Sequence, residues 1–173
     1  TRRSSDLTLS PVLSDATEQR VDEILETLCD REQTLSMAES CTGGLLSSLF
    51  TDVPGCSHAF VAGYVSYTEQ AKSDMLGVDS VMISENGAVS RSVAIAMAEG
   101  ALDKSGSDFA VSITGFAGGA GEDEEDGLVF MACAVRDGLT LHEEHHFGAK
   151  GRGEIRLMCI RAAVSMLHHA VLT

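Results

Sequence analysis

The chain has 173 residues, of which 44% are hydrophobic, enough for one domain with a buried core. Its formal net charge of −14 repels phosphate backbones and acidic membrane surfaces, so neither nucleic acid nor a membrane is expected as a partner. A small anionic ligand is compatible with this charge, because a pocket needs only a few local donors. We expect no membrane-spanning helix, and the polar stretch 1–15 lacks the apolar centre of a secretory signal.

The cysteines indicate the cellular compartment. There are five of them, widely spaced and without a C-x-x-C pair. This usage is typical of reduced thiols in a cytosol rather than of a disulfide framework or a zinc site. We therefore expect a cytoplasmic protein with a flexible N-terminal tail over 1–15 and a single domain over 16–173.

Helices and strands alternate along the first half of the chain, as apolar spacing and turn residues indicate. The expected elements are a helix over 16–30, a strand over 34–39, a glycine turn, a helix over 45–50, a strand within 59–67 and a short helix over 70–76 that ends at Gly77.

The second half begins with a helix over 90–104, which Ser90 can cap. Strands over 109–113 and 128–135 follow, and Asp137-Gly138 predicts a hairpin that returns the segment 139–147 antiparallel. The last helix is expected over 152–172, with these residues facing inward: Ile155, Met158, Cys159, Ala162 and Met166. The predicted fold is α/β, a single-domain layered sandwich in which helices cover a mixed β-sheet.

The first candidate site is Ser40-Cys41-Thr42-Gly43-Gly44, which lies between a strand and a helix. A hydroxyl at this position is exposed at a helix N-terminus, where backbone N–H groups can hold an anion or a developing oxyanion. By local pattern alone, the simpler interpretation is that Ser40 or Thr42 only caps the helix.

Two later segments also carry candidate groups. Lys72 follows a strand and could act as a general base if burial lowered its pKa, although a solvated helix lysine is the simpler interpretation. Thr114-Gly115 opens a glycine-rich turn after another strand, where the backbone can approach a ligand closely. That turn is neither a Walker loop nor an ordered G-x-G-x-x-G fingerprint, and an ordinary turn is the alternative.

Taken together, these segments resemble the CinA C-terminal family over residues 28–172. The matching strings occur in the family's order and spacing: Glu39-Ser40-Cys41-Thr42-Gly43-Gly44, Tyr67-x-x-x-Ala71-Lys72, Gly87-Ala88-Val89-Ser90 and Thr114-Gly115-x-Ala117-Gly118. Characterised members of this family are nicotinamide mononucleotide amidohydrolases. The resemblance therefore implies an amidase that converts nicotinamide mononucleotide into nicotinic acid mononucleotide and ammonia.

The resemblance also implies roles for individual residues. Ser40 matches the family's nucleophile, Lys72 its general base, and Tyr67 a tyrosine that supports this pair. Backbone N–H groups near Thr42, Gly43 and Gly44 would stabilise the oxyanion. This Ser–Lys chemistry needs no metal and no cofactor.

Two arginines complete the expected substrate site. Arg152 and Arg156 are four residues apart at the start of the last helix, so they share a face. They match a pair of family arginines, one of which could hold the substrate phosphate, whereas solvated surface arginines are the alternative. Homo-oligomerisation is a further expectation from the resemblance.

The chain departs from the family in the glycine-rich turn. The family continues with Ala-Gly-Pro and a Lys-Pro-Val-Gly-Thr segment, whereas here the turn is shorter and is filled by the acidic run 122–126. Carboxylates and a missing lysine do not favour a phosphate. The alternative function is therefore a catalytically altered or inactive domain that acts as a nucleotide-binding or regulatory module.

Two other catalytic interpretations are weaker. His142-Glu143-Glu144-His145-His146 contains H-E-x-x-H, but on a strand its two histidines would be roughly 13 Å apart, too far to share one zinc ion. Cys41 could replace Ser40 as nucleophile with His58 as base, although a small buried thiol is the simpler interpretation.

Overall fold

The computed structural model describes residues 8–9 and 11–173, which form six helices and five strands. In chain order these are α1 (Asp15–Asp30), β1 (Leu35–Glu39), α2 (Leu45–Thr51), β2 (Phe60–Val65), α3 (Glu69–Leu76), α4 (Ser80–Asn86), α5 (Arg91–Ser105), β3 (Phe109–Gly115), β4 (Leu128–Val135), β5 (Leu141–His146) and α6 (Arg152–Leu172). The predicted elements are all present, and the sequence analysis missed only α4. That helix has only seven residues. Its N-cap residue, Asp79, precedes it and accepts a hydrogen bond from the N–H of Val81.

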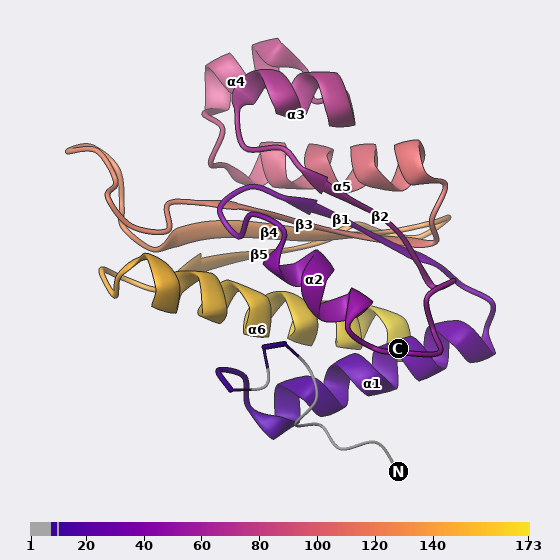
Figure 1. Ribbon diagram of the computed structural model, residues 1–173. Helices are drawn as coiled ribbons and strands as arrows, with labels where there is room; N and C mark the ends of the chain where they lie inside the picture. The colour runs from indigo at the N-terminus through magenta and orange to yellow at the C-terminus, as the bar shows by residue number, and fades with distance from the viewer. Residues whose placement is uncertain (1–7, 10) are drawn as a thin grey trace.

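The five strands form one mixed sheet in the order β2-β1-β3-β4-β5. β1 lies parallel to both β2 and β3, while β3–β4 and β4–β5 are antiparallel. Helices cover both faces, with α5 on one and α1, α2 and α6 on the other (Figure 1). The predicted mixed sheet covered by helices is therefore confirmed.

The sheet face beneath α5 is lined by small residues. Ala38 from β1, Ala110 from β3 and Ala132 from β4 are fully buried there against an alanine-rich helix face. Small side chains on both surfaces allow the helix and the sheet to approach closely. α3 and α4 pack outside this layer against α5 (Figure 1).

Larger apolar residues fill the opposite face, between the sheet and α1, α2 and α6. From the sheet, Leu35, Met37 and Ile113 are fully buried in this core. The inward face of α6 differs from the prediction, because Met158 and Ala162 are only partly buried. The buried residues of α6 are Ile155, Cys159, Ile160, Ala163, Val164, Met166, Leu167 and Val171.

By length and composition alone, α6 could cross a membrane, a test that the buried core helices of other proteins also pass. Its apolar residues pack against the sheet and against α1. A helix buried between two other elements must be apolar on more than one side, so its composition follows from its place in the core.

Part of the predicted tail, residues 1–7 and 10, lies outside the described residues. Within the described part, Leu13 is buried and Leu9 packs against the core. Thr8 donates hydrogen bonds to the Asp52 carboxylate through its N–H and its hydroxyl. The segment just before α1 is thus attached to the domain.

The contact between α3 and α5 gives a test of the packing. A β-carbon at Gly100 of α5 would overlap the carbonyl oxygen of Leu76 at the end of α3. We expect G100A to lower the free energy of unfolding by about 1–3 kcal/mol, the usual cost of overpacking.

The matched control is Gly153 in the first turn of α6, which is exposed and where an added β-carbon meets no atom within 4 Å among the described residues. G153A should leave stability unchanged or raise it by up to about 1 kcal/mol, because alanine favours a helix more than glycine does. Urea unfolding followed by circular dichroism measures both variants. Equal effects of the two substitutions would contradict the close approach of α3 and α5.

Candidate active site

The turn between β1 and α2 is organised by Glu39, a residue to which the sequence analysis gave no role. Glu39 is fully buried, and its carboxylate accepts five hydrogen bonds of 2.6–3.1 Å. The donors are the hydroxyls of Thr42 and Ser47 and the backbone N–H groups of Gly44, Leu46 and Ser47. A carboxylate at the N-terminus of a helix is stabilised by these N–H groups and by the helix dipole.

A signal for this role was present in the sequence. The N-cap of α2 is Gly44, which has no side chain to accept from the first turn, and that turn contains no acidic residue. The N–H groups of α2 therefore needed an acceptor from elsewhere. The nearest candidate was the carboxylate at the end of the preceding strand.

The turn presents Ser40 to Lys72, which lies on α3. The Lys72 Nζ and the Ser40 Oγ are joined by a hydrogen bond of 3.1 Å. Lys72 is only 1% exposed and Ser40 7% exposed. Burial lowers the pKa of the Lys72 amine below its ordinary value, because water no longer stabilises the charged form, and Cys41 and Glu69 oppose this shift only in part.

Two backbone carbonyls complete the surroundings of the amine. The Lys72 Nζ donates to the carbonyl oxygens of Ser66 at 2.9 Å and of Tyr67 at 3.4 Å. A neutral amine has two N–H groups and one lone pair. When the two carbonyls accept the N–H groups, the lone pair is left for the Ser40 hydroxyl, which is the arrangement that a general base requires.

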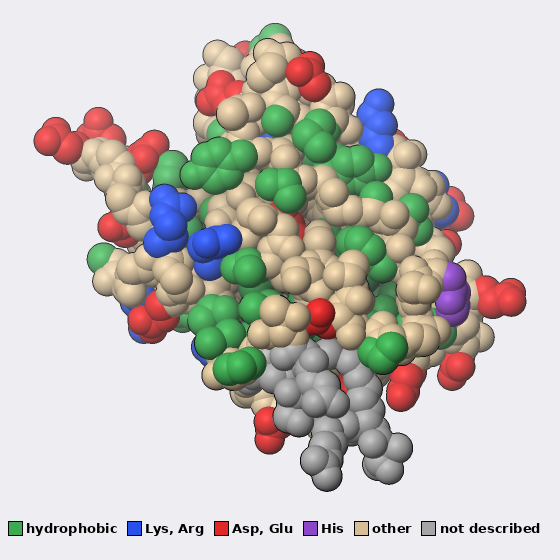
Figure 2. Space-filling model, in the orientation of Figure 1, with side chains coloured by type: hydrophobic (Ala, Val, Ile, Leu, Met, Phe, Trp, Pro, Cys, Tyr) green, Lys and Arg blue, Asp and Glu red, His purple; other side chains and the backbone are tan. Residues whose placement is uncertain are grey.

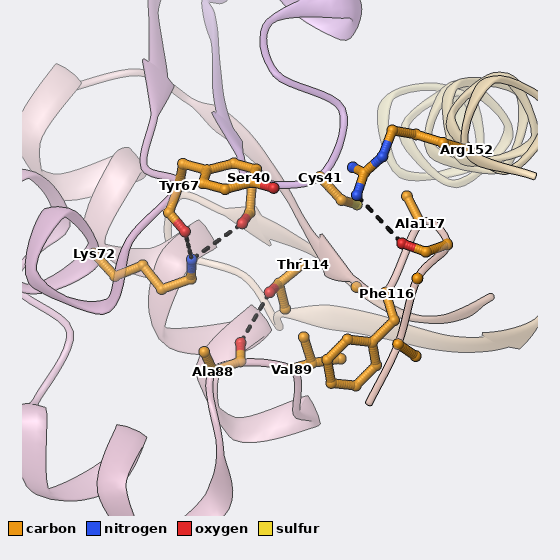
Figure 3. A pocket seen from close by; sticks show the side chains of 14 residues that line it. Ser40, Cys41, Tyr67, Lys72, Ala88, Val89, Thr114, Phe116, Ala117 and Arg152 are labelled. Atoms are coloured by element: carbon orange, nitrogen blue, oxygen red, sulfur yellow. Dashed lines mark hydrogen bonds between the residues drawn. The ribbon is translucent and has the colours of Figure 1, made fainter. Parts of the chain in front are cut away.

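A cavity of about 270 Å³ opens next to this pair. Figure 3 shows Ser40, Lys72 and Tyr67 on one side and Arg152 on the other, with Thr114 between them. The lining residues are Ser40, Cys41, Tyr67, Lys72, Ala88, Val89, Thr114, Gly115, Phe116, Ala117, Gly118, Gly119, Ala120 and Arg152. The site is thus built from the segments that follow β1, β2 and β3, together with residues 88–89 before α5 and the start of α6.

Of the ten residues expected to catalyse the reaction or bind the substrate, six line this cavity: Ser40, Lys72, Tyr67, Thr114, Gly115 and Arg152. The Tyr67 side chain is 62% exposed at the mouth of the cavity, and its backbone carbonyl, rather than its phenol, contacts Lys72. The Thr114 hydroxyl donates to the carbonyl of Ala88, which ties the end of β3 to the segment before α5.

The other four of the ten expected site residues are not among the lining residues: Thr42, Gly43, Gly44 and Arg156. The Arg156 Nη2 donates to the carbonyl of Thr42 at 2.9 Å, so this guanidinium supports the turn from beneath. Arg152 makes a different contact, since its Nη2 donates to the carbonyl of Gly118 at the cavity rim.

The backbone N–H groups of residues 41–44 differ in whether another residue accepts a hydrogen bond from them. The N–H of Gly43 donates to the Ser40 carbonyl, and that of Gly44 donates to Glu39. Among the described residues, no other residue accepts from the N–H of Cys41 or of Thr42. The N–H groups that have no acceptor in another described residue therefore lie at residues 41 and 42, whereas the glycine N–H groups serve the turn itself.

The acidic run 122–126 lies in the segment between β3 and β4, which projects from the molecule (Figures 1 and 2). Two of its carboxylates organise the turn that enters it: Asp126 accepts from the N–H of Ala120, and Glu124 from the N–H of Gly121. Negative charge consequently lies close to the rim that Arg152 occupies.

The H-E-x-x-H string lies on strand β5, as its hairpin position predicted. His145 pairs with Glu143, and His146 lies between Glu125 and Glu144. Within residues 8–9 and 11–173, no three ligand-type side chains converge as a metal site would require. All five cysteines are free thiols.

Known proteins share both the sequence and the fold of this domain. A CinA-like protein of Geotalea daltonii is 45% identical over 141 residues, which are 80% of this chain and 34% of that protein. A CinA-like protein of Synechococcus sp. is 42% identical over 146 residues, 83% of this chain and 35% of that protein. The chain thus spans about a third of the length of these curated relatives.

Solved structures agree over nearly the whole domain. The competence/damage inducible protein CihA from Agrobacterium tumefaciens superposes with a TM-score of 0.88 at 40% identity, covering 94% of this chain and 99% of that one. A competence-damaged protein (CinA) superfamily protein from Escherichia coli superposes with a TM-score of 0.84 at 30% identity, covering 93% and 94%. The family described as the CinA C-terminal domain matches residues 17–171, and the chain belongs to that family.

Proposed function

We propose that this domain is an amidohydrolase that converts nicotinamide mononucleotide into nicotinic acid mononucleotide and ammonia. The observation that carries the proposal is the 3.1 Å hydrogen bond between the Lys72 amine and the Ser40 hydroxyl at the wall of a cavity. A serine is a weak nucleophile at its free pKa and needs a neighbouring base. The buried amine, whose pKa is lowered, supports that role.

The proposed reaction has two halves. The Ser40 Oγ attacks the carboxamide carbon while Lys72 takes the hydroxyl proton, and the N–H groups of Cys41 and Thr42 stabilise the oxyanion. Lys72 returns the proton to the departing nitrogen, so that ammonia leaves an acyl-enzyme ester. Water, deprotonated by Lys72, then cleaves the ester and restores Ser40.

Arg152 is the proposed ligand of the substrate phosphate. It lies at the cavity rim, across from Ser40 and Lys72 (Figure 3). A guanidinium presents several donors in a planar fork that suits phosphate oxygens. Arg156 is proposed to act differently, by holding the carbonyl of Thr42 and so the shape of the turn.

A second candidate function is a nucleotide-binding module without catalysis. The carboxylates of Glu124 and Asp126 lie in the turn next to the rim and oppose the binding of a phosphate there. Ammonia release by the wild-type protein separates the two functions. Binding of the nucleotide in calorimetry without ammonia release would favour the module.

The Ser–Lys pair is tested by S40A and K72M with nicotinamide mononucleotide as substrate. Each variant should lower kcat by at least about 1,000-fold, because the nucleophile and its base act as a unit. Methionine keeps most of the buried volume of Lys72, so the fold should persist. The measurement is ammonia release, with circular dichroism as the check on folding.

The matched control is K104M, since Lys104 is exposed in the last turn of α5, away from the cavity. It should keep the wild-type rate. C41A should retain measurable turnover, which separates Ser40 from Cys41 as the nucleophile. A folded S40A protein with the wild-type rate would end the proposal.

The pH profile tests Lys72 as the base. The amine accepts a proton only when neutral, so kcat/KM should rise with pH through the Lys72 pKa and then level off. Because burial lowers that pKa, the rise should be centred below the ordinary lysine value of about 10.4. The rate is measured between pH 6 and pH 10.5, and a flat profile over this range would contradict the assignment.

The role of Arg152 is tested with a substrate pair that differs only in the phosphate. R152A should raise KM for nicotinamide mononucleotide by about 10-fold, the loss of one charge-assisted contact. It should leave kcat/KM for nicotinamide riboside unchanged. R156A should instead impair both substrates alike, and equal losses for both substrates in R152A would show that Arg152 does not bind the phosphate.

A further inference from the structure

One aromatic side chain of the cavity stands apart from the apolar cores. Phe116 is half-buried and lines the cavity. All six phenylalanines lie in the described part of the chain, and the other five belong to one of the two cores or pack against it: Phe50, Phe60, Phe109, Phe130 and Phe147. Phe116 does neither. Core packing therefore does not account for a phenyl ring at this position.

The backbone holds this ring in place. The N–H of Phe116 donates to the carbonyl of Leu128 at 2.9 Å, and the carbonyl of Phe116 accepts from the N–H of Gly127 at 2.8 Å. The preceding residue, Gly115, pairs with Val129 at the end of the β3–β4 ladder. Phe116 thus continues the ladder beyond the last paired residue. A ring on such a fixed backbone loses little freedom when a ligand binds against it.

Small apolar residues lie next to the ring. Ala88 and Val89 line the same cavity, and Figure 3 shows Val89 beside the ring of Phe116. The Thr114 hydroxyl donates to the carbonyl of Ala88 at 2.8 Å, which attaches this segment to the end of β3. In the same view, Phe116 and the Ser–Lys pair lie on opposite sides of Thr114. The cavity therefore has a reactive end and an apolar, aromatic end.

The proposed substrate carries a ring that suits the aromatic end. In a nicotinamide nucleotide the ribose is bonded to the ring nitrogen, so the pyridine ring is a flat cation, whereas free nicotinamide is neutral. The face of a phenyl ring is electronegative and attracts a cation that lies over it. The carboxamide is bonded directly to the pyridine ring, so a substrate whose carboxamide lies at Ser40 must place this ring inside the cavity.

We propose that Phe116 is the platform for the pyridinium ring and makes the site selective for cationic pyridines over neutral ones. The inference rests on the proposed amidase function, from which the substrate is taken. Contact with the ring is the same in the bound substrate and in the transition state. Loss of the platform should therefore raise KM and leave kcat nearly unchanged, unlike the loss of Ser40 or Lys72.

The first experiment measures the kinetics of wild type, F116L and F116Y with nicotinamide mononucleotide and nicotinamide riboside. Leucine is apolar but has no aromatic face, so F116L should raise KM about 10-fold for both substrates, the loss of one shielded cation–π contact. F116Y keeps the ring and should restore KM to within about 3-fold of wild type. The equal loss for both substrates distinguishes Phe116 from Arg152, which is expected to act only on the phosphorylated one.

The matched control is F130L. Phe130 of β4 is also half-buried, but it packs against the core beneath α5 and does not line the cavity. F130L should keep the wild-type KM for both substrates, and circular dichroism checks that all variants are folded. An unchanged KM in folded F116L, or an equal increase in F130L, would overturn the platform.

A second experiment tests the selectivity for charge with two small ligands. The probe 1-methylnicotinamide is a pyridinium without ribose or phosphate, and nicotinamide is its neutral counterpart. Titrations followed by protein NMR use the S40A background, so that neither ligand is hydrolysed. The Kd of 1-methylnicotinamide should be about 10-fold lower than that of nicotinamide, and adding F116L should remove the difference. Equal weakening of both ligands by F116L would overturn the selectivity.

Binding and turnover fail independently. If wild type releases no ammonia from nicotinamide mononucleotide, the amidase proposal fails, and the titrations still decide whether Phe116 holds a cationic pyridine. If wild type is active and F116L matches it in both KM and the titrations, the platform is wrong and the amidase proposal stands.

Discussion

The arrangement of the site depends on one buried carboxylate. Glu39 ends β1 in the middle of the molecule and accepts five hydrogen bonds from the turn and the first residues of α2. A buried carboxylate is costly unless its lone pairs are satisfied, and the N–H groups of a helix N-terminus are costly to bury without acceptors. The N–H groups of α2 satisfy the carboxylate, and the carboxylate accepts from these N–H groups. Ser40 directly follows Glu39, so these hydrogen bonds fix its position.

Sheet topology brings the remaining groups to Ser40. β2, β1 and β3 are neighbours and parallel, so the segments that follow them emerge at the same edge. Tyr67 and Lys72 follow β2, Ser40 follows β1, and Gly115 ends β3. Residues that are far apart in the sequence therefore share one cavity, and the amine of Lys72 is enclosed by the wall that these segments form.

α6 connects this cavity to the core. Its first turn places Arg152 at the rim, while Arg156, four residues later, reaches beneath the turn to Thr42. Further along, the same helix packs its apolar residues against the sheet and α1. A change in the turn thus acts on a segment that α6 holds from the core side.

Apart from α4, the order of the elements and the mixed sheet could be predicted from the sequence, because apolar spacing, glycine turns and the Asp137-Gly138 hairpin are local signals. Which side chains face the cavity depends on contacts between distant segments of the folded chain. Arg152 and Arg156 share a helix face yet separate into rim and support, and Glu39 rather than the glycine turn occupies the N–H groups of α2. Burial of Lys72 could not be predicted from the sequence either, since it arises between segments that meet only when the sheet is assembled.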